Sequence, residues 1–285
     1  LSLHDALPIS AIRGALIEEA VKKFPDSFIT VDVNDKDAFT VKCGRIKTRL
    51  AGNKADEFPE RDNMSASKTV VLPANEFCDM IASTEMCISV DDARITLTGG
   101  CLDVVRGSVS MVGLDGFRMA VRTVRLSTVP DEDMRVIIPL KTLGILKRLL
   151  NNAGSELIEL RFTDKDFGLV YGDAEVLCSL IEGSYVEYSQ IVPKSFSTVV
   201  SLDARQFRET VDRAAMIARL GENRLIRLSV RENAITVYAN SGTDEITEVI
   251  DAMTDGADMD IAFNVKYMLD AVKMFGSGEI ELKMN

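Results

Sequence analysis

An internal repeat constrains the fold of this chain more than any other feature of its sequence. One unit, named the A unit, spans residues 12–59 and recurs at residues 138–193. Each copy begins with a helical stretch and continues as a strand, a polar turn and two further extended segments. A third copy begins at Phe263 and runs to the last residue. Repetition of this kind predicts similar structural modules that pack against one another.

A second unit, named the B unit, alternates with the first. The string VVLPANEFCDMI at 70–81 matches VVSLDARQFRETV at 199–211, and each copy predicts a strand, a helix and further strands. Asp203 is the expected N-cap of the second B helix, with Gln206 three residues on as in a capping box. Residues 226–240 alternate apolar and polar side chains around a turn, as in a β-hairpin. The chain therefore predicts an α+β fold of repeated domains.

The order of units is A, B, A, B, A, and each B–A pair makes one domain. The first A unit has no B unit before it, and the third A unit stops inside a strand. We therefore expect the chain to be a piece of a longer protein, truncated at both ends. Residues 1–10 match nothing in the repeat and hold the only histidine, His4. We expect them to be a non-native leader.

Cysteine usage and hydropathy point to the cytoplasm. The five cysteines form no CxxC pair and mostly occupy apolar stretches, which predicts free thiols in a reducing compartment. No apolar run approaches the length of a membrane span, and no export signal is recognisable. We expect a cytoplasmic protein with no membrane partner.

The motifs of common enzyme classes are missing from the sequence. A single histidine excludes a histidine-rich metal site, and no nucleotide-binding or zinc-protease motif is present. Gly99 and Gly100 are interpreted as a turn. The acidic runs at 91–92 and 131–133 could serve acid–base or metal chemistry, but solvated loop acids are the better interpretation. We expect no catalytic residues, no metal and no cofactor.

A basic helix face recurs in the A units although the chain carries a net charge of −11. Lys141 and Arg148 share one face of the second A helix, and Lys266 and Lys273 repeat that spacing in the third. The repeat offset of about 125 residues leads from Arg148 back to Lys23. Solvation of helix faces is the ordinary role of such residues. Recurrence in an acidic chain favours contacts with phosphates, which are non-specific and salt-sensitive.

Several strings resemble the bacterial sliding clamp family, the DNA polymerase III beta subunits. They include AGNKADEFPE at 51–60, VGLDGFRMA at 112–120, IIPLKTLGILKRLL at 137–150 and DMDIAFNVKYMLDAV at 258–272. The resemblance implies a DNA-clamp fold with helices that line a ring and antiparallel sheets outside. It assigns residues 11–62 to the second half of a first clamp domain, 63–195 to the second domain and 196–285 to a third domain that lacks its last strands.

The resemblance also implies the partners. Clamps of this family are head-to-tail homodimers that encircle double-stranded DNA without sequence specificity and confer processivity on the replicative polymerase. Polymerase, clamp loader and repair proteins bind through a linear peptide motif that enters a hydrophobic pocket. Here that pocket would comprise Leu97, Leu114, Gly116, Phe117, Arg118, Met119, Val186, Gln190, Ile191, Asn223, Asn264 and Tyr267.

Four of these pocket positions depart from the family pattern. Leu114, Phe117, Val186 and Gln190 stand where the family has Thr, His, Pro and a common Arg. These changes make the pocket rim more apolar, so the motif preference is expected to differ.

Two further residue sets follow from the basic face and the resemblance. In the family, paired tyrosines face the DNA at the positions of Ile95 and Thr96. The expected DNA-facing residues are Lys22, Lys23, Ile95, Thr96, Lys141, Lys147, Arg148, Arg205, Arg208, Lys266 and Lys273. The expected dimer interface places Arg45, Lys47 and Arg49 of the first A unit opposite Asp244 and Glu245 of the second B unit. Leu50 of the A unit is expected to lie near Ile217 of the B unit.

Two other functions compete with the clamp. A peptide-binding α/β scaffold without a DNA role would keep the pocket but would not need the basic helix faces. An enzyme would need a metal or a nucleophile–base pair, and none is recognisable in the sequence.

Overall fold

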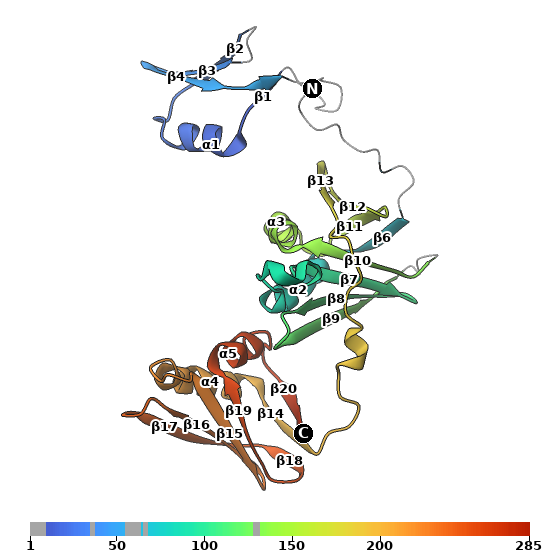
Figure 1. Cartoon of the computed structure of the whole chain (residues 1–285), viewed down its shortest axis with the longest axis vertical. Coiled ribbons are helices and arrows are strands. Elements are labelled where there is room, and N and C mark those ends of the chain that lie inside the picture. The colour runs from blue at the N-terminus through green and yellow to red at the C-terminus, as the bar shows by residue number, and fades with distance from the viewer. Residues whose placement is uncertain (1–9, 35–37, 55–63, 65–67, 128–131) are drawn as a thin grey trace. The chain divides into compact units, whose positions relative to one another are not determined.

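The chain forms two compact units in a computed structural model, residues 1–65 and residues 66–285 (Figure 1). The structure describes residues 10–34, 38–54, 64, 68–127 and 132–285. Asp131 of the acidic run, most of the string at 51–60 and all of the expected leader except Ser10 lie outside the described residues.

The first unit is a small sheet with one helix. Its main sheet has the antiparallel order β2–β3–β4, and β1 pairs separately with β5. Ile29, Val31 and Val33 of β2 lie opposite Cys43, Val41 and Phe39 of β3, so these apolar residues share one face. The elements are β1 (Ser10–Ala11), α1 (Gly14–Lys22), β2 (Ile29–Val33), β3 (Ala38–Cys43), β4 (Ile46–Ala51) and β5 (Asn53–Lys54).

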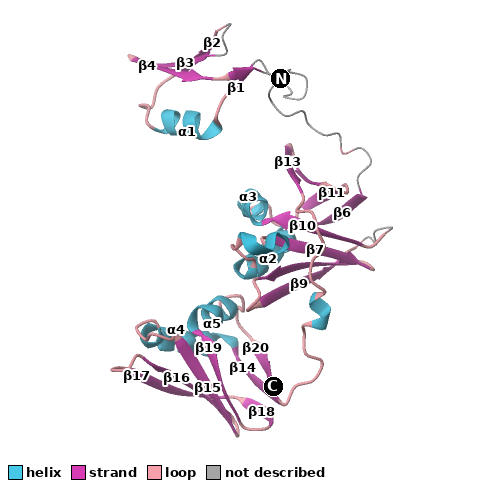
Figure 2. Ribbon diagram, viewed as in Figure 1, coloured by secondary structure: helices cyan, strands magenta, loops and turns pink. Residues whose placement is uncertain are grey.

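The second unit begins with a domain of two four-stranded antiparallel sheets and two helices (Figure 2). The sheet orders are β13–β12–β11–β6 and β10–β7–β8–β9. The elements are β6 (Lys68–Pro73), α2 (Ala74–Thr84), η2 (Glu85–Cys87), η3 (Asp92–Leu97), β7 (Gly99–Val105), β8 (Ser108–Leu114), β9 (Met119–Arg125), β10 (Met134–Pro139), α3 (Leu140–Leu150), β11 (Leu157–Phe162), β12 (Asp166–Tyr171) and β13 (Ala174–Ser179).

The core of this domain joins both helices to both sheets. Phe77, Met80 and Ile81 of α2 and Leu143 and Leu146 of α3 are completely buried. They belong to one cluster with residues of β6, β7, β8, β11 and β12. Lys141 and Arg148 of α3 lie outside this core and are exposed, as the helical spacing predicts.

The chain ends in a second domain of the same design. Its sheets have the orders β18–β14–β20 and β17–β16–β15–β19, and α4 packs beside α5. The elements are η4 (Tyr188–Gln190), β14 (Thr198–Asp203), α4 (Ala204–Ala218), β15 (Leu225–Arg231), β16 (Ala234–Asn240), β17 (Glu245–Asp251), β18 (Met253–Gly256), β19 (Met259–Asn264), α5 (Val265–Val272) and β20 (Glu279–Met284).

The α+β fold and its repeat are confirmed by the strand pairing. In the domain that contains α2 and α3, β11 pairs with β6. In the domain that contains α4 and α5, β20 pairs in the same antiparallel way with β14. The predicted N-cap is also present, because the Asp203 carboxylate accepts a hydrogen bond of 2.8 Å from the Gln206 backbone N–H. One face of α4 is buried, including Phe207, Val211 and Ala214.

Two local predictions are wrong. Gly99 and Gly100 form no turn; they begin β7, where a Cβ on Gly99 would lie 2.6 Å from the Ile138 carbonyl oxygen. Glycine is needed there because two strands approach closely. Asp92 does not lie in a loop but begins η3, and the Asp91 carboxylate caps it by accepting from the Ala93 N–H at 3.0 Å.

All five cysteines are free thiols, as the sequence predicts. Among the described residues, none of the helices has both the length and the apolar character needed to cross a membrane.

Candidate functional surfaces

Two of the predicted pocket residues lie in a small apolar cluster on the first domain of the second unit. Leu97 and Leu114 are 3% and 7% exposed, and Tyr185 packs over them with its ring buried. The Tyr185 hydroxyl donates to the Val112 carbonyl oxygen at 3.4 Å. Met119, another predicted pocket residue, packs at the edge of this cluster. The cluster provides an apolar base for a docking site.

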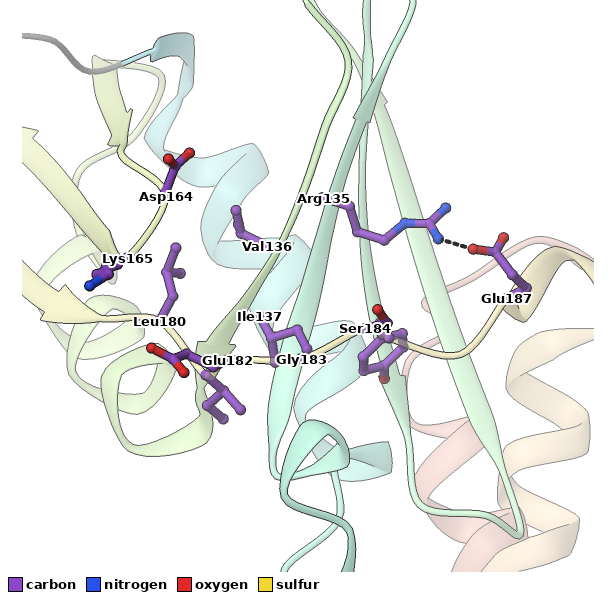
Figure 3. Close-up of a pocket in the computed structure, with 12 residues that line it drawn as sticks. Arg135, Val136, Ile137, Asp164, Lys165, Leu180, Glu182, Gly183, Ser184 and Glu187 are labelled. Atoms are coloured by element: carbon purple, nitrogen blue, oxygen red, sulfur yellow. Dashed lines mark hydrogen bonds and ion pairs between the residues drawn. The ribbon is translucent and has the colours of Figure 1, made fainter.

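The segment that follows β13 is fixed to the sheet beside this cluster. The Ile181 N–H donates to the Ile137 carbonyl oxygen at 2.9 Å. Gly183 has a φ of +128°, and a Cβ there would lie 2.7 Å from the Thr96 side chain. Figure 3 shows Leu180, Gly183 and Ser184 in line along this segment, which borders a cavity of about 470 Å³. The backbone of the segment is therefore held in one position by the fold.

A polar network holds the far end of the same segment. Arg135 pairs with Asp103 at 2.9 Å and with Glu187 at 2.5 Å, the pair drawn in Figure 3. The Tyr188 hydroxyl donates to Asp103 at 2.8 Å, and burial together with this bond raises the pKa of Tyr188 to about 12. Asp103 is only 6% exposed, and these partners satisfy its buried side-chain oxygen with hydrogen bonds. Sequence reasoning missed this network; a lone acid in the apolar string GGCLDVV was its only signal.

Arg118 connects the two domains of the second unit. Its guanidinium pairs with Asp115 at 3.0 Å and with Asp270 of α5 at 2.6 Å. It also donates to the Met86 carbonyl oxygen and lies 4.4 Å from the centre of the Tyr267 ring. Only 16% of the Arg118 side chain is exposed. A residue predicted to face a peptide is therefore engaged mainly in holding the domain junction.

A cavity of about 910 Å³ lies at this junction, named the junction cavity. Phe117 stands at it with 84% of its surface exposed and stacks on Tyr267 with ring centres 6.4 Å apart. Five predicted pocket residues line the junction cavity: Leu97, Gly116, Phe117, Arg118 and Tyr267.

The remaining predicted pocket residues do not line the junction cavity. Val186, Gln190 and Ile191 are exposed along the segment after β13, and Asn223 is exposed in the turn before β15. Asn264 caps α5 by accepting from the Lys266 N–H at 2.9 Å. The structure thus brings five of the twelve predicted residues to the junction cavity and leaves the other seven outside its lining.

The predicted basic face divides into free and paired residues. Lys141, Arg148, Lys266 and Lys273 are exposed on α3 and at α5, and none of them makes an ion pair with a described residue. Arg208 of α4 is half-buried and likewise unpaired within the described chain. The other four cations of the predicted set form ion pairs: Lys22 with Glu18, Lys23 with Glu19, Lys147 with Glu85 and Arg205 with Glu209. The two uncharged positions of the set are Ile95, which is exposed, and Thr96, which is half-buried.

The predicted dimer residues lie in both units. Arg45, Lys47 and Arg49 are exposed in the first unit, and Leu50 is buried within that unit at 8% exposure. In the second unit Ile217 is half-buried. Asp244 accepts from the hydroxyls of Ser241 and Thr243, and Glu245 accepts from the Tyr238 hydroxyl at 3.4 Å.

No described group of three or more histidine, cysteine or acidic side chains is arranged to hold a metal ion. Every buried side-chain nitrogen or oxygen in the described residues has a hydrogen-bond partner.

Comparison with known proteins identifies the family of this chain. Family models of the central and C-terminal domains of the DNA polymerase III beta subunit match residues 71–187 and 189–285. The chain is 26% identical to the beta sliding clamp of Bacillus subtilis and 27% identical to that of Staphylococcus aureus, over 95% of this chain and 72% of each relative.

Solved structures give the same result. The crystal structure of the Bacillus subtilis sliding clamp superposes with a TM-score of 0.86 at 26% identity, over 96% of this chain and 72% of that one. A beta subunit structure from Eubacterium rectale superposes with a TM-score of 0.87 at 23% identity, over 96% and 75% of the two chains, which shows the shared fold. The chain belongs to the DNA polymerase III beta subunit family, the non-catalytic bacterial sliding clamps.

Proposed function

We propose that this chain encircles duplex DNA as a sliding clamp and tethers the replicative polymerase to it. The observation that supports this most directly is the recurrent basic face of α3 and α5. Lys141 and Arg148 on one helix, and Lys266 and Lys273 on its equivalent, are all exposed and free of ion pairs with described residues. Unpaired cations also occur elsewhere on the chain, but only these four recur at equivalent positions of two repeated helices, which is the arrangement that a phosphate backbone running past both helices would need.

Contacts of this kind suit a protein that moves along DNA. Lysine and arginine bind phosphates by releasing counterions, and this attraction does not depend on base sequence. Because the net charge of the chain is −11, its acidic surfaces repel DNA. Duplex DNA is therefore expected to bind at basic surfaces such as these helix faces.

The partner site of the proposed function lies around the domain junction of the second unit. Exposed Phe117 beside Tyr267 and the buried cluster under Tyr185 offer apolar surface with nearby polar anchors. This combination suits an extended peptide. We propose that polymerase, clamp loader and repair proteins bind there through a linear motif.

The proposed assembly is a head-to-tail homodimer of clamp domains. We assign residues 11–62 to half of a first domain, 63–195 to a second and 196–285 to a third. Exposed Arg45, Lys47 and Arg49 would meet Asp244 and Glu245 of the partner subunit, which fits a heterologous interface. We place the protein in the cytoplasm.

Charge reversal on the helix face tests the DNA role. We expect Lys141→Glu, Arg148→Glu and Lys273→Glu together to weaken binding to a labelled duplex. The slope of log affinity against log salt should fall by about 3, one phosphate contact for each residue. Fluorescence anisotropy across a salt series measures both quantities.

A matched variant carries the same charge change at exposed positions away from α3 and α5: Arg106→Glu in the turn between β7 and β8, and Arg122→Glu and Arg125→Glu on β9. These arginines make no side-chain ion pair with described residues. The proposal predicts a near-native slope for this variant. Equal losses in both variants would show that only net charge matters. If the duplex fails to bind while apolar peptides still do, the alternative of a peptide-binding scaffold without a DNA role is correct.

A further inference from the structure

A second cavity of the domain junction is strongly basic. It has a volume of about 540 Å³ and lies between the end of α4 and the start of α5. We call it the basic recess. The residues that define its character are Arg219, Arg224, Lys266, Tyr267, Asp270 and Lys273.

The charge of the basic recess is not balanced from within. Arg219, Arg224, Lys266 and Lys273 are exposed, and none of their side chains pairs with an acid of the described residues. The one acid in the lining is Asp270, and Arg118 already holds it at 2.6 Å. A recess with four free cations in a chain of net charge −11 attracts an anionic ligand.

The basic recess adjoins the junction cavity. Both cavities are lined by Lys266 and Tyr267, so the two lie side by side at these residues. Tyr267 stacks on Phe117, the most exposed aromatic ring of the junction cavity. An extended chain with apolar residues at Phe117 and Tyr267 therefore places its neighbouring residues beside Arg219 and Arg224.

The shape of the basic recess favours a peptide over duplex DNA. A duplex is stiff and presents its phosphates on a convex surface, so it can meet Lys266 and Lys273 at the exposed side of α5 but does not enter the recess toward Arg219 and Arg224. An aspartate or glutamate side chain on an extended peptide can enter the recess and approach two guanidinium groups. Arginine is well suited to this because its donors match a carboxylate in a two-bond geometry.

We propose that the basic recess reads acidic residues next to the apolar part of a partner peptide. This inference rests on the peptide-docking part of the proposed function and adds a charge preference to it. Arg219 and Arg224 are the specificity-determining residues. Neither belongs to the residue sets predicted for the peptide pocket or for DNA.

Three fluorescent peptides with one shared leucine- and phenylalanine-rich core test the proposal. They carry a flank of aspartates, of asparagines or of lysines, and each is made with the flank before and after the core. With the whole chain at low salt, we expect the better aspartate peptide to bind about 10-fold more tightly than its asparagine counterpart. The advantage should shrink to about 2-fold in high salt because the charges are screened.

Two variants locate the effect. Arg219→Gln with Arg224→Gln should remove the aspartate advantage and leave the affinity of the asparagine peptide unchanged. Arg219→Glu with Arg224→Glu should transfer the advantage to the lysine peptide. The matched control, Arg122→Gln with Arg125→Gln on β9, should retain the wild-type order of affinities. Circular dichroism melts establish that all the variants are folded.

The outcomes separate this inference from the function on which it rests. If the asparagine peptide binds and aspartate adds nothing, the charge preference is overturned while peptide docking stands. If none of the peptides binds, peptide docking fails and the inference fails with it. If Arg219→Gln with Arg224→Gln weakens duplex DNA and leaves every peptide unchanged, the recess serves DNA and the inference is overturned.

Discussion

The sheet of the first unit and the equivalent sheet of the first domain in the second unit have the same design but very different burial. Ile158, Leu160 and Phe162 of β11 are 1%, 0% and 2% exposed. The matching repeat positions in β2 are Ile29, Val31 and Val33, which are 38%, 49% and 39% exposed.

The difference lies in what covers the strand. β11 pairs with β6 on one side and β12 on the other, and its apolar face shares a core with Phe77, Met80 and Ile81 of α2. β2 pairs with β3 alone, and no described residue occupies its outer edge. Val41 and Cys43 of β3 are buried at 0% and 1%, so the first unit covers part of its apolar face only.

An A unit therefore does not bury its own sheet. Val41 and Cys43 of β3 are buried within the unit, but the edge strand β2 lacks the cover that β6 and α2 give to β11. Repeat proteins share this property, because each module depends on its neighbour for a complete core. An apolar edge strand without a neighbour is also a site where another chain can add a strand.

The largest expected effect is on stability, when the equivalent residues Ile158 and Ile29 are each replaced by alanine. Ile158→Ala should lower the free energy of unfolding of its domain by about 2–5 kcal/mol, because it leaves a cavity in a packed core. Ile29→Ala should lower that of the first unit by less than about 1 kcal/mol, because its side chain is already in contact with water. Native-state hydrogen exchange of β12 and β3 amides in urea reads the two units separately. Equal losses of unfolding free energy in the two units would contradict the difference in burial between the two strands.

The ion pairs of the two regions also differ in exposure, with smaller expected effects on stability. Arg118 is 16% exposed between Asp115 and Asp270, whereas Lys22 of the first unit is 71% exposed beside Glu18. Arg118→Ala leaves two shielded carboxylates without a cation and should cost about 2 kcal/mol in urea unfolding. Lys22→Ala should change stability by less than about 0.5 kcal/mol. A loss at Lys22 as large as that at Arg118 would refute the role given to the junction.

The smallest effect concerns pH. Burial opposes the ionisation of Asp115, but hydrogen bonds from the Phe117 and Arg118 N–H groups and the Arg118 guanidinium outweigh it and hold the pKa of Asp115 below its ordinary value. The stabilisation is therefore present above pH 3.8 and is lost as the pH falls through the lowered folded-state pKa. Asp115→Asn should be less stable than the wild type at neutral pH, and the gap should narrow below pH 3.8. Urea unfolding at both pH values measures it; a constant gap would contradict the assignment.

Local patterns predicted the elements well. Helical spacing placed α3 on Leu140–Leu150, and alternation placed the β15–β16 hairpin at its observed position. These predictions succeed because a helix or strand buries one face at a fixed period. The repeat predicted the equivalent strand pairs for the same reason, since each copy carries the same pattern.

The contacts that shape the candidate site could not be predicted in this way. Arg118 and Asp270 are 152 residues apart in the chain, and Tyr188 and Asp103 are 85 residues apart. Periodicity does not encode which distant residues pair. The pairing of Lys147 with Glu85 likewise follows from the packing of α3 beside α2, so one predicted DNA contact is engaged in an ion pair.

Retention on closed DNA tests the central claim most directly. The protein is loaded onto nicked circular duplex with a clamp loader and passed through a gel-filtration column in salt that releases non-specific contacts. The account predicts that the protein stays with the circle and leaves once a restriction enzyme makes the DNA linear. Equal retention on circular and linear DNA, or none on either, would contradict a clamp that encircles the duplex.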